Sequence, residues 1–246
     1  FRGRNGSAAE SRKRVILWDD TWVRYHEPSI GRAAVEVLEA VGFEVRLVEG
    51  RVCCGRPAAS RGLIDELRRA ATHNLRLLEG TNEPIVFLEP SCWSVFVDEY
   101  RQLGIDGADR VADRCVLFED FMSEVFRKTD LVGAFSDGAA EVVVHSHCHS
   151  QALAEPMTTV SLLGNLPDVS VQELDTGCCG MAGAFGMLSE SRPLSHQVAE
   201  PLIAALDALP AETAVVASGT SCRHQISDLS DRQPLHIAEF LAGRLK

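Results

Sequence analysis

The sequence predicts an α/β protein of two pseudo-repeated, Rossmann-like units, whose parallel sheets face a shared cysteine-lined cleft. Short apolar strands alternate with stretches of helical periodicity, which is typical of parallel sheets covered by helices on both faces. The order of elements recurs in the two halves. Each half also carries an adjacent cysteine pair followed by glycine, Cys53-Cys54-Gly55 and Cys178-Cys179-Gly180. With 246 residues, 46% of them hydrophobic, the chain can build one large core or two small ones.

The first repeat is expected over residues 14–135. Ile30, Ala34 and Val37 recur at helical spacing, and Gly42 is well placed to end that helix. In order, the sequence predicts a strand at 15–17, a helix at 30–41, a strand at 44–48, a helix at 64–78, a strand at 85–88 and a closing helix at 117–126.

The second repeat is expected over residues 136–246, joined to the first near 128–139. Strands are predicted at 142–144, 169–174 and 214–217, with a closing helix at 235–245. Residues 1–13 are polar and rich in glycine and charge, and Phe1 is not an initiator. We interpret them as a linker or expression remnant of a longer protein.

Charge and composition exclude several classes of partner. Lys and Arg number 24 against 35 Asp and Glu, a net charge of −11, which disfavours nucleic acid and anionic membranes as primary partners. No apolar run approaches the ~18 residues of a membrane span, and no signal-peptide pattern occurs. We expect a cytoplasmic protein with no direct membrane insertion, whose only membrane link is through partners. Eight cysteines in such a chain indicate metal or redox chemistry rather than a disulfide framework.

The cysteine motifs follow predicted strands and precede predicted helices. This order places them at the carboxyl edge of each sheet, where open α/β folds bind ligands. Helix amino termini at that edge favour thiolate over thiol. If the two units face each other, both cysteine sets converge on one cleft.

The second half holds the fuller set of thiols. Cys148, Cys178, Cys179 and Cys222 would suffice for a 4Fe–4S cluster. Aligning the first strands of the two halves places Thr21 where Cys148 stands, so the first half keeps the three candidate ligands Cys53, Cys54 and Cys92. Cys115 stands outside every motif and is expected only to pack.

Zinc is the main chemical alternative, because four thiolates also suit that ion. Zinc sites usually take cysteines two to four residues apart, whereas the pairs here are directly adjacent, so we favour iron–sulfur. A dithiol–disulfide couple between neighbouring cysteines is the third option.

Histidines and arginines surround the motifs. We expect His145 to pack at a strand end, and His147 and His149 to serve as hydrogen-bond donors to cluster sulfur rather than as ligands. His224 would be such a donor or face solvent. Other neighbours have expected supporting roles: Arg56 and Arg223 offset thiolate charge, while Gly180 and Gly183 let the backbone approach the cluster.

Together these motifs resemble the CCG cysteine-rich domain family. That family occurs in heterodisulfide reductases and in the iron–sulfur subunits of glycolate oxidases. The closest likeness is to the carboxyl-terminal iron–sulfur region of FAD-linked D-lactate dehydrogenase-like oxidoreductases. The resemblance covers nearly everything after Arg14 and rests on Glu27-Pro28, Gly31-Arg32-Ala33-Ala34, Cys53-Cys54-Gly55-Arg56-Pro57, Leu88-Glu89-Pro90-Ser91-Cys92, His147-Cys148-His149, Gly177-Cys178-Cys179-Gly180-Met181-Ala182-Gly183 and Ser221-Cys222-Arg223-His224-Gln225.

Departures from the full family pattern limit the number of clusters expected. Thr21 replaces a leading cysteine, and Val95 and Gln225 stand where the final cysteines would be. Two five-cysteine clusters are therefore not expected. One cluster on the second half, with the first-half thiols facing it, fits better.

The resemblance implies the iron–sulfur part of an oxidoreductase. Its cluster would relay electrons from FAD on a separate domain or subunit, which oxidises a D-2-hydroxy acid such as D-lactate, to a quinone, cytochrome or carrier protein. A ferredoxin-like segment is a further implied partner, and the isolated chain is expected to be inactive. The alternative function is a thiol–disulfide reductase module of the heterodisulfide type, with catalysis at the cluster.

Overall fold

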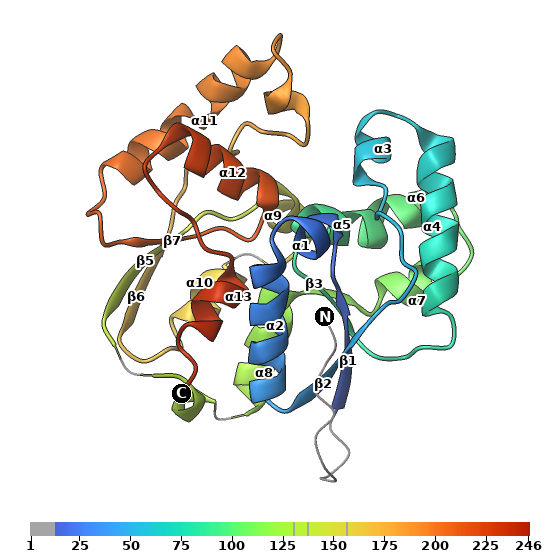
Figure 1. Cartoon of the computed structure of the whole chain (residues 1–246), viewed down its shortest axis with the longest axis horizontal. Coiled ribbons are helices and arrows are strands. Elements are labelled where there is room, and N and C mark those ends of the chain that lie inside the picture. Colours follow the sequence, from blue (N-terminus) through green and yellow to red (C-terminus); the bar gives the residue numbers. More distant parts are fainter. Residues whose placement is uncertain (1–12, 130, 137, 156) are drawn as a thin grey trace.

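The computed structural model describes residues 13–129, 131–136, 138–155 and 157–246, and Figure 1 shows how its strands and helices alternate. The expected linker lies outside the described residues except for Lys13, which begins the first strand. Two parallel sheets are present, as the sequence predicts. The α/β class and the two-unit arrangement are confirmed.

The first sheet has the order β2-β1-β3-β4, and all its strands are parallel. A left-handed glycine, Gly42 with φ of 94°, follows the first long helix at the position predicted to end it. The strands are β1 (Lys13–Trp18), β2 (Phe43–Leu47), β3 (Ile85–Phe87) and β4 (Cys115–Leu117). The helices are α1 (Thr21–Tyr25), α2 (Pro28–Ala40), α3 (Arg56–Ser60), α4 (Ile64–Leu78), α5 (Pro90–Ser94), the π-helix η1 (Val95–Glu99), α6 (Tyr100–Gln102), α7 (Ala108–Ala112) and α8 (Phe118–Lys128).

The second sheet has the order β6-β5-β7, again parallel. Its strands are β5 (Ala140–Val144), β6 (Val169–Glu173) and β7 (Ala214–Val216). The helices are α9 (Cys148–Leu153), α10 (Thr158–Leu163), α11 (Arg192–Asp207), α12 (Thr220–Leu229) and α13 (Ile237–Ala242), with short 3₁₀ turns η2 (Val132–Ala134) and η3 (Phe185–Met187).

The repeat extends to a strand position that sequence patterning does not reveal. Cys115 opens β4, which pairs with β3. In the second half, Leu235 makes an isolated parallel bridge to Val216 of β7 and so takes the equivalent fourth place. These two edge segments are too short to show periodicity, so only the pairing identifies them.

The closing helix of each half packs against the other half. Helix α13 contacts α2, and α8 contacts α10. Figure 1 shows these four helices lying between the two sheets. One hydrophobic core therefore joins the halves, including Leu17 and Leu38 from the first, and Val144, Leu162 and Leu241 from the second.

Each half also has a core of its own on the side away from this junction. In the first half Trp18, Phe87 and Phe96 pack as an aromatic group, with Trp18 and Phe96 centroids 4.7 Å apart. The second half has a smaller cluster that includes Leu202 and Ile226. Among the described residues, no helix is both long enough and apolar enough to cross a membrane.

Candidate metal centre

Four thiols of the second half form a continuous series of neighbours. Cys148 is the first residue of α9, and Cys222 lies in the first turn of α12. Cys178 and Cys179 lie in the loop after β6. The Cys148 thiol contacts Cys178, Cys178 contacts Cys179, and Cys179 contacts Cys222. The structure thus brings together the four residues that the sequence selects as the fullest set.

Proton sharing along this series favours alternate thiolates. The hydrogen bond from Cys148 lowers the pKa of Cys178, and the hydrogen bond from Cys179 lowers the pKa of Cys222. Bonding to those partners, together with burial, raises the pKa values of Cys148 and Cys179. The Gly180 N–H also donates to Cys178 Sγ at 3.4 Å. Thiolate is the form that binds soft metals.

His145 lies closer to these thiols than the sequence suggests. One ring nitrogen and the sulfurs of Cys179 and Cys222 all lie within 4.8 Å of one another. The His145 ring is buried, and its Nδ1 has no hydrogen-bond partner. Packing at the end of a strand explains why the His145 ring is buried, but it does not explain why the ring lies close to Cys179 and Cys222. The available sequence signal was its place directly after β5, level with the motif loops.

His147 and His149 flank Cys148 and differ in surroundings. His147 caps α9 by accepting the His149 N–H at Nδ1, 3.1 Å away. Its ring lies so close to Gly219 that a Cβ there would stand 2.2 Å from the ring. Burial, followed by the His147 charge, lowers the pKa of His149 to about 4, so its ring is neutral at pH 7. Neutral imidazole can donate through one nitrogen and accept through the other.

The first half repeats the same arrangement with one thiol fewer. Thr21 begins α1 as Cys148 begins α9, and its hydroxyl contacts the Cys53 thiol. The Sγ atoms of Cys54 and Cys92 lie 2.9 Å apart, matching the contact between Cys179 and Cys222. The structure therefore supports the alignment that places a threonine where the second half has a cysteine.

Buried carboxyls adjoin this incomplete set, a feature the sequence analysis does not foresee. Asp20 caps α1 through Oδ1, whereas its Oδ2 is buried without a partner. Burial and the nearby Glu89 raise the pKa of Asp20 to about 7. The hydrogen bond from Cys54 lowers the pKa of Cys92, but burial and these two carboxylates outweigh it and raise the value to about 11. The first-half thiols are thus held mainly protonated.

Both cysteine sets meet at the junction of the halves. Glu89, three residues before Cys92, accepts the N–H of Thr220, two residues before Cys222, at 2.7 Å. Helix α5, which carries Cys92, contacts α9, which begins at Cys148. Figure 1 shows α1, α5, α9 and α12 gathered where the two halves meet. The strand–helix order places each set at the carboxyl edge of its own sheet, and the way in which the halves join brings the two sets together, as expected if the units face each other.

The two arginines near the motifs make their hydrogen bonds to oxygen atoms. Arg56 bonds the Ser91 carbonyl at 3.2 Å and pairs with Glu99 at 2.5 Å. The buried Arg223 bonds the Ser218 carbonyl at 2.7 Å and Glu27 at 2.6 Å, which ties the two halves together. Their role in offsetting thiolate charge stays a prediction, and the bonds show that both also brace the loops.

Three other predicted residues lie in distinct environments. The His224 ring packs edge-on against Trp22 at 5.0 Å and approaches Glu27 at 3.5 Å, so it joins α12 to α1. Gly183 adopts φ of 66° with open space where a Cβ would be. Cys115 opens β4, where its Sγ donates to the Val111 carbonyl at 3.2 Å and burial raises its pKa. It packs against the first-half core, and its carbonyl accepts the Trp93 indole N–H at 3.3 Å.

Gly180→Ala should disturb the metal centre more than Gly177→Ala does. Both glycines have positive φ, 84° and 74°, which costs alanine about 1–2 kcal/mol. An added Cβ at Gly180 would also meet the Ser195 backbone oxygen at 2.2 Å, whereas Gly177 has open space. Overpacking adds roughly 1–3 kcal/mol. Denaturant unfolding and metal content of both variants test this, and equal losses would contradict it.

Comparison with known families extends this description of the site. A family model described as the cysteine-rich domain, CCG, matches residues 21–96 and 142–227. The chain is 31% identical over 232 residues to lactate utilization protein A of Bacillus pumilus (strain SAFR-032), covering 89% of this chain and 94% of that protein. The corresponding protein of Bacillus thuringiensis (strain Al Hakam) is 31% identical over 245 residues, covering 94% and 99%.

A relative of greater length and a solved structure also match. A subunit of the anaerobic glycerol-3-phosphate dehydrogenase of Escherichia coli (strain K12) is 27% identical over 252 residues, and this chain spans 62% of its length. The crystal structure of a hypothetical protein from Helicobacter pylori superposes with a TM-score of 0.57 at 12% identity, over 96% of this chain and 50% of that one, which shows a shared fold. The matched segments contain every cysteine of the chain except Cys115, and the chain belongs to the CCG cysteine-rich domain family.

Proposed function

We propose that this chain is the iron–sulfur electron-transfer part of a FAD-linked dehydrogenase acting on a D-2-hydroxy acid such as D-lactate. The observation that carries the proposal is the continuous series of four thiols, Cys148, Cys178, Cys179 and Cys222, at the carboxyl edge of a parallel sheet. Relatives named for lactate utilization, and for one component of a glycerol-3-phosphate dehydrogenase, support a role within an oxidoreductase.

The donor set fits a 4Fe–4S cluster, which would supply one-electron steps when bound. Four thiols are available, and two of them are already favoured as thiolates by their neighbours. Cys179 and Cys222 are only 3% and 2% exposed, so they would hold the inner side away from water. Cys148 is exposed, which leaves an outward side from which an electron can leave or enter.

Backbone groups around the four thiols would influence the redox potential of a bound cluster. The Gly180 N–H points at Cys178 Sγ, and hydrogen bonds to sulfur are among the factors that set a cluster's potential. Glu89 and Arg223 fix the Cys222 loop to the first half, so the ligand positions depend on both units. The protein would position the cluster and shield it from water, because the rate of electron transfer depends on redox potential and on distance.

The proposal includes the partners that such a relay requires. A flavin-binding domain or subunit would deliver electrons, with a ferredoxin-like segment as a further carrier. A quinone, cytochrome or carrier protein would accept them. We place the assembly in the cytoplasm, with membrane association through these partners.

Two observations support the alternative functions. His145, Cys179 and Cys222 are close enough together to hold one ion, which supports a zinc site. The 2.9 Å approach of Cys54 Sγ to Cys92 Sγ supports a thiol–disulfide reductase module. We favour the relay because zinc sites usually take cysteines two to four residues apart, whereas Cys178 and Cys179 are directly adjacent, and because a disulfide couple needs only two thiols.

Stopped-flow spectroscopy of the complete enzyme with its flavin partner tests the proposal. On mixing with D-lactate, flavin absorbance should fall first, and the broad visible absorbance of the iron–sulfur chromophore should change afterwards. A quinone analogue should then restore both signals. Substrate turnover at full rate with an unchanging iron–sulfur spectrum would rule out the relay and leave a structural role.

A further inference from the structure

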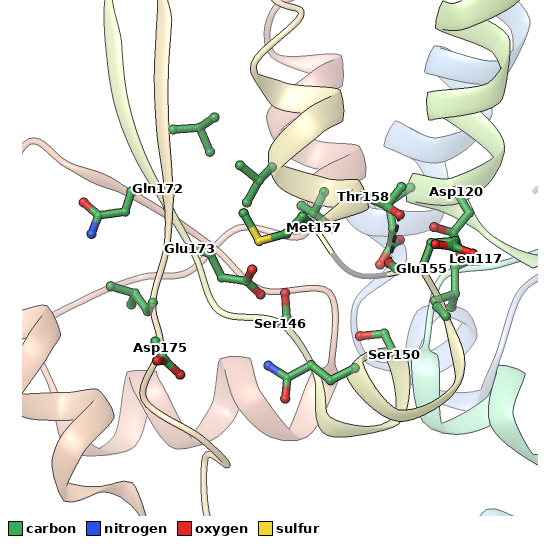
Figure 2. A pocket seen from close by; sticks show the side chains of 17 residues that line it. Leu117, Asp120, Ser146, Ser150, Glu155, Met157, Thr158, Gln172, Glu173 and Asp175 are labelled. Carbon is green, nitrogen blue, oxygen red and sulfur yellow. Dashed lines mark hydrogen bonds between the residues drawn. The ribbon is translucent and has the colours of Figure 1, made fainter.

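A pocket of about 720 Å³ lies beside the candidate metal centre but is lined by none of the motif cysteines. It is bounded by the carboxyl end of β6, the start of α8, and helices α9 and α10. Ser146, two residues before Cys148, reaches into it, as Figure 2 shows. The site is independent of the function proposed above, because none of its lining groups is a proposed metal ligand.

The charged side chains that line this pocket are all acidic. Its lining contains five carboxylates and, among the described residues, no Lys, Arg or His. None of the five carboxylates takes part in an ion pair with a described residue. Figure 2 shows Glu173 near Ser146 and Asp120 beside Glu155 on the other side. The five are Glu119, Asp120, Glu155, Glu173 and Asp175.

Glu119 is the least satisfied of these groups. It is 4% exposed, and its Oε2 has no hydrogen-bond partner, although Ser218 approaches the carboxyl. Burial, with a contribution from Asp120, raises the pKa of Glu119 to about 7. Burial also raises the pKa of Asp120. A carboxylate buried without a counter-charge costs stability, so a cation supplied from outside would complete this environment.

The spacing of the carboxylates argues against a single metal ion. Among the described residues, the one group of three or more metal-binding side chains within 4.8 Å of one another is His145, Cys179 and Cys222. The pocket carboxylates are therefore spread too widely to surround one ion. Leu117 and Met157 add apolar surface between them. Such a lining suits a cationic head on a hydrocarbon stem.

We infer that this pocket binds an organic cation, an ammonium or guanidinium group carried on an apolar chain. Two sources offer that chemistry, a free amine and a Lys or Arg side chain of a partner protein. Glu119 and Asp120 would receive the charge on one side, and Glu173 would receive it on the other. Ser146 would accept a further hydrogen bond.

Titration calorimetry of the full chain at low salt tests the site. The probes are 1,5-diaminopentane, for a free amine, and the capped peptide Gly-Lys-Gly-Arg-Gly, for a partner side chain. At least one should bind with one-to-one stoichiometry. Glu119→Gln and Glu173→Gln should each weaken that binding about tenfold or more, since each removes a charge-assisted hydrogen bond. Glu200→Gln, an exposed charge change on α11, should leave it unaltered.

The results of these titrations distinguish a free amine from a partner side chain, and an organic cation from a metal ion. Binding of the peptide alone identifies a partner side chain, and binding of the diamine alone identifies a free amine. Glu119→Gln should keep or raise the melting temperature, because it removes a buried charge that has no counter-charge. If that variant does not fold, Glu173→Gln carries the comparison. No binding of either probe up to about 10 mM, equal binding by all variants, or displacement of both probes by stoichiometric Mg²⁺ would overturn the inference.

Discussion

Cys179→Ser and Cys222→Ser are each expected to strip the anaerobically purified protein of iron and acid-labile sulfide. Both thiols are buried and contact each other within the four-thiol series, and serine oxygen is a poor ligand for iron–sulfur centres. We expect at least a tenfold loss, since changing even the hydrogen-bond partners of a metal ligand costs about 10–100-fold in metal affinity. Cys148→Ser and Cys178→Ser should lose or alter the cluster. Elemental analysis, a sulfide assay and electron paramagnetic resonance measure the effect.

Cys115→Ser is the matched control, since it changes a thiol in the first-half core and should keep iron and sulfide at wild-type levels. Cys54→Ser and Cys92→Ser should have smaller effects. Loss in Cys115→Ser with retention in Cys179→Ser would overturn the ligand assignment. Stoichiometric zinc without sulfide in the wild type would overturn the cluster itself.

Variants of His145 and Cys148 distinguish a four-thiol cluster from a single metal ion in the same measurements of metal content. A lone ion on His145, Cys179 and Cys222 would be lost in His145→Ala and kept in Cys148→Ser. A cluster on the four thiols predicts the reverse pattern. The two variants therefore give opposite results under the two hypotheses.

Thr21→Cys is expected to raise iron and sulfide per chain to about twice the wild-type value. The new thiol would stand at the start of α1, where the hydroxyl already contacts Cys53, as Cys148 contacts Cys178. With Cys53, Cys54 and Cys92 it would complete four thiolates, the number a 4Fe–4S cluster requires. Iron analysis and visible absorbance after anaerobic reconstitution measure the gain.

Thr21→Ser is the control for this substitution, because it keeps the hydroxyl and adds no ligand. An unchanged iron content in Thr21→Cys, with the new thiol freely alkylated, would show that the missing cysteine is not what limits the first half. Two clusters already present in the wild type would contradict the assumption that the first-half set is incomplete.

The sequence identified the thiols that the structure brings together, largely because the motifs that mark them are local. Each motif cysteine sits next to a strand of apolar residues, such as Val142 to Val144 before Cys148, and strand ends of a parallel sheet meet at one edge. Helices α2 and α4 were also predictable, since their apolar periodicity spans several turns. The correspondence of Thr21 with Cys148 needed only the alignment of two strands.

Short elements and polar burial were not predictable in this way. Strand β4 and the Leu235 bridge are defined by their pairing partners and leave no periodic pattern. The approach of His145 to Cys179 and Cys222 depends on where three separate loops lie. The acidic pocket likewise draws its carboxylates from α8, from the end of β6 and the loop after it, and from the segment between α9 and α10.

The sequence by itself determined the α/β class, the repeat and the thiols that the structure gathers. Tertiary structure alone decided how the halves join. The closing helices α8 and α13 each pack against a helix of the other half, while α8 also contacts β3 and β4 of its own sheet, so that one core includes Phe118 and Leu241 together. Amphipathic periodicity indicates that a helix has an apolar face, but it does not indicate which apolar surface that face will pack against. That choice depends on the shapes and areas available once both sheets have formed.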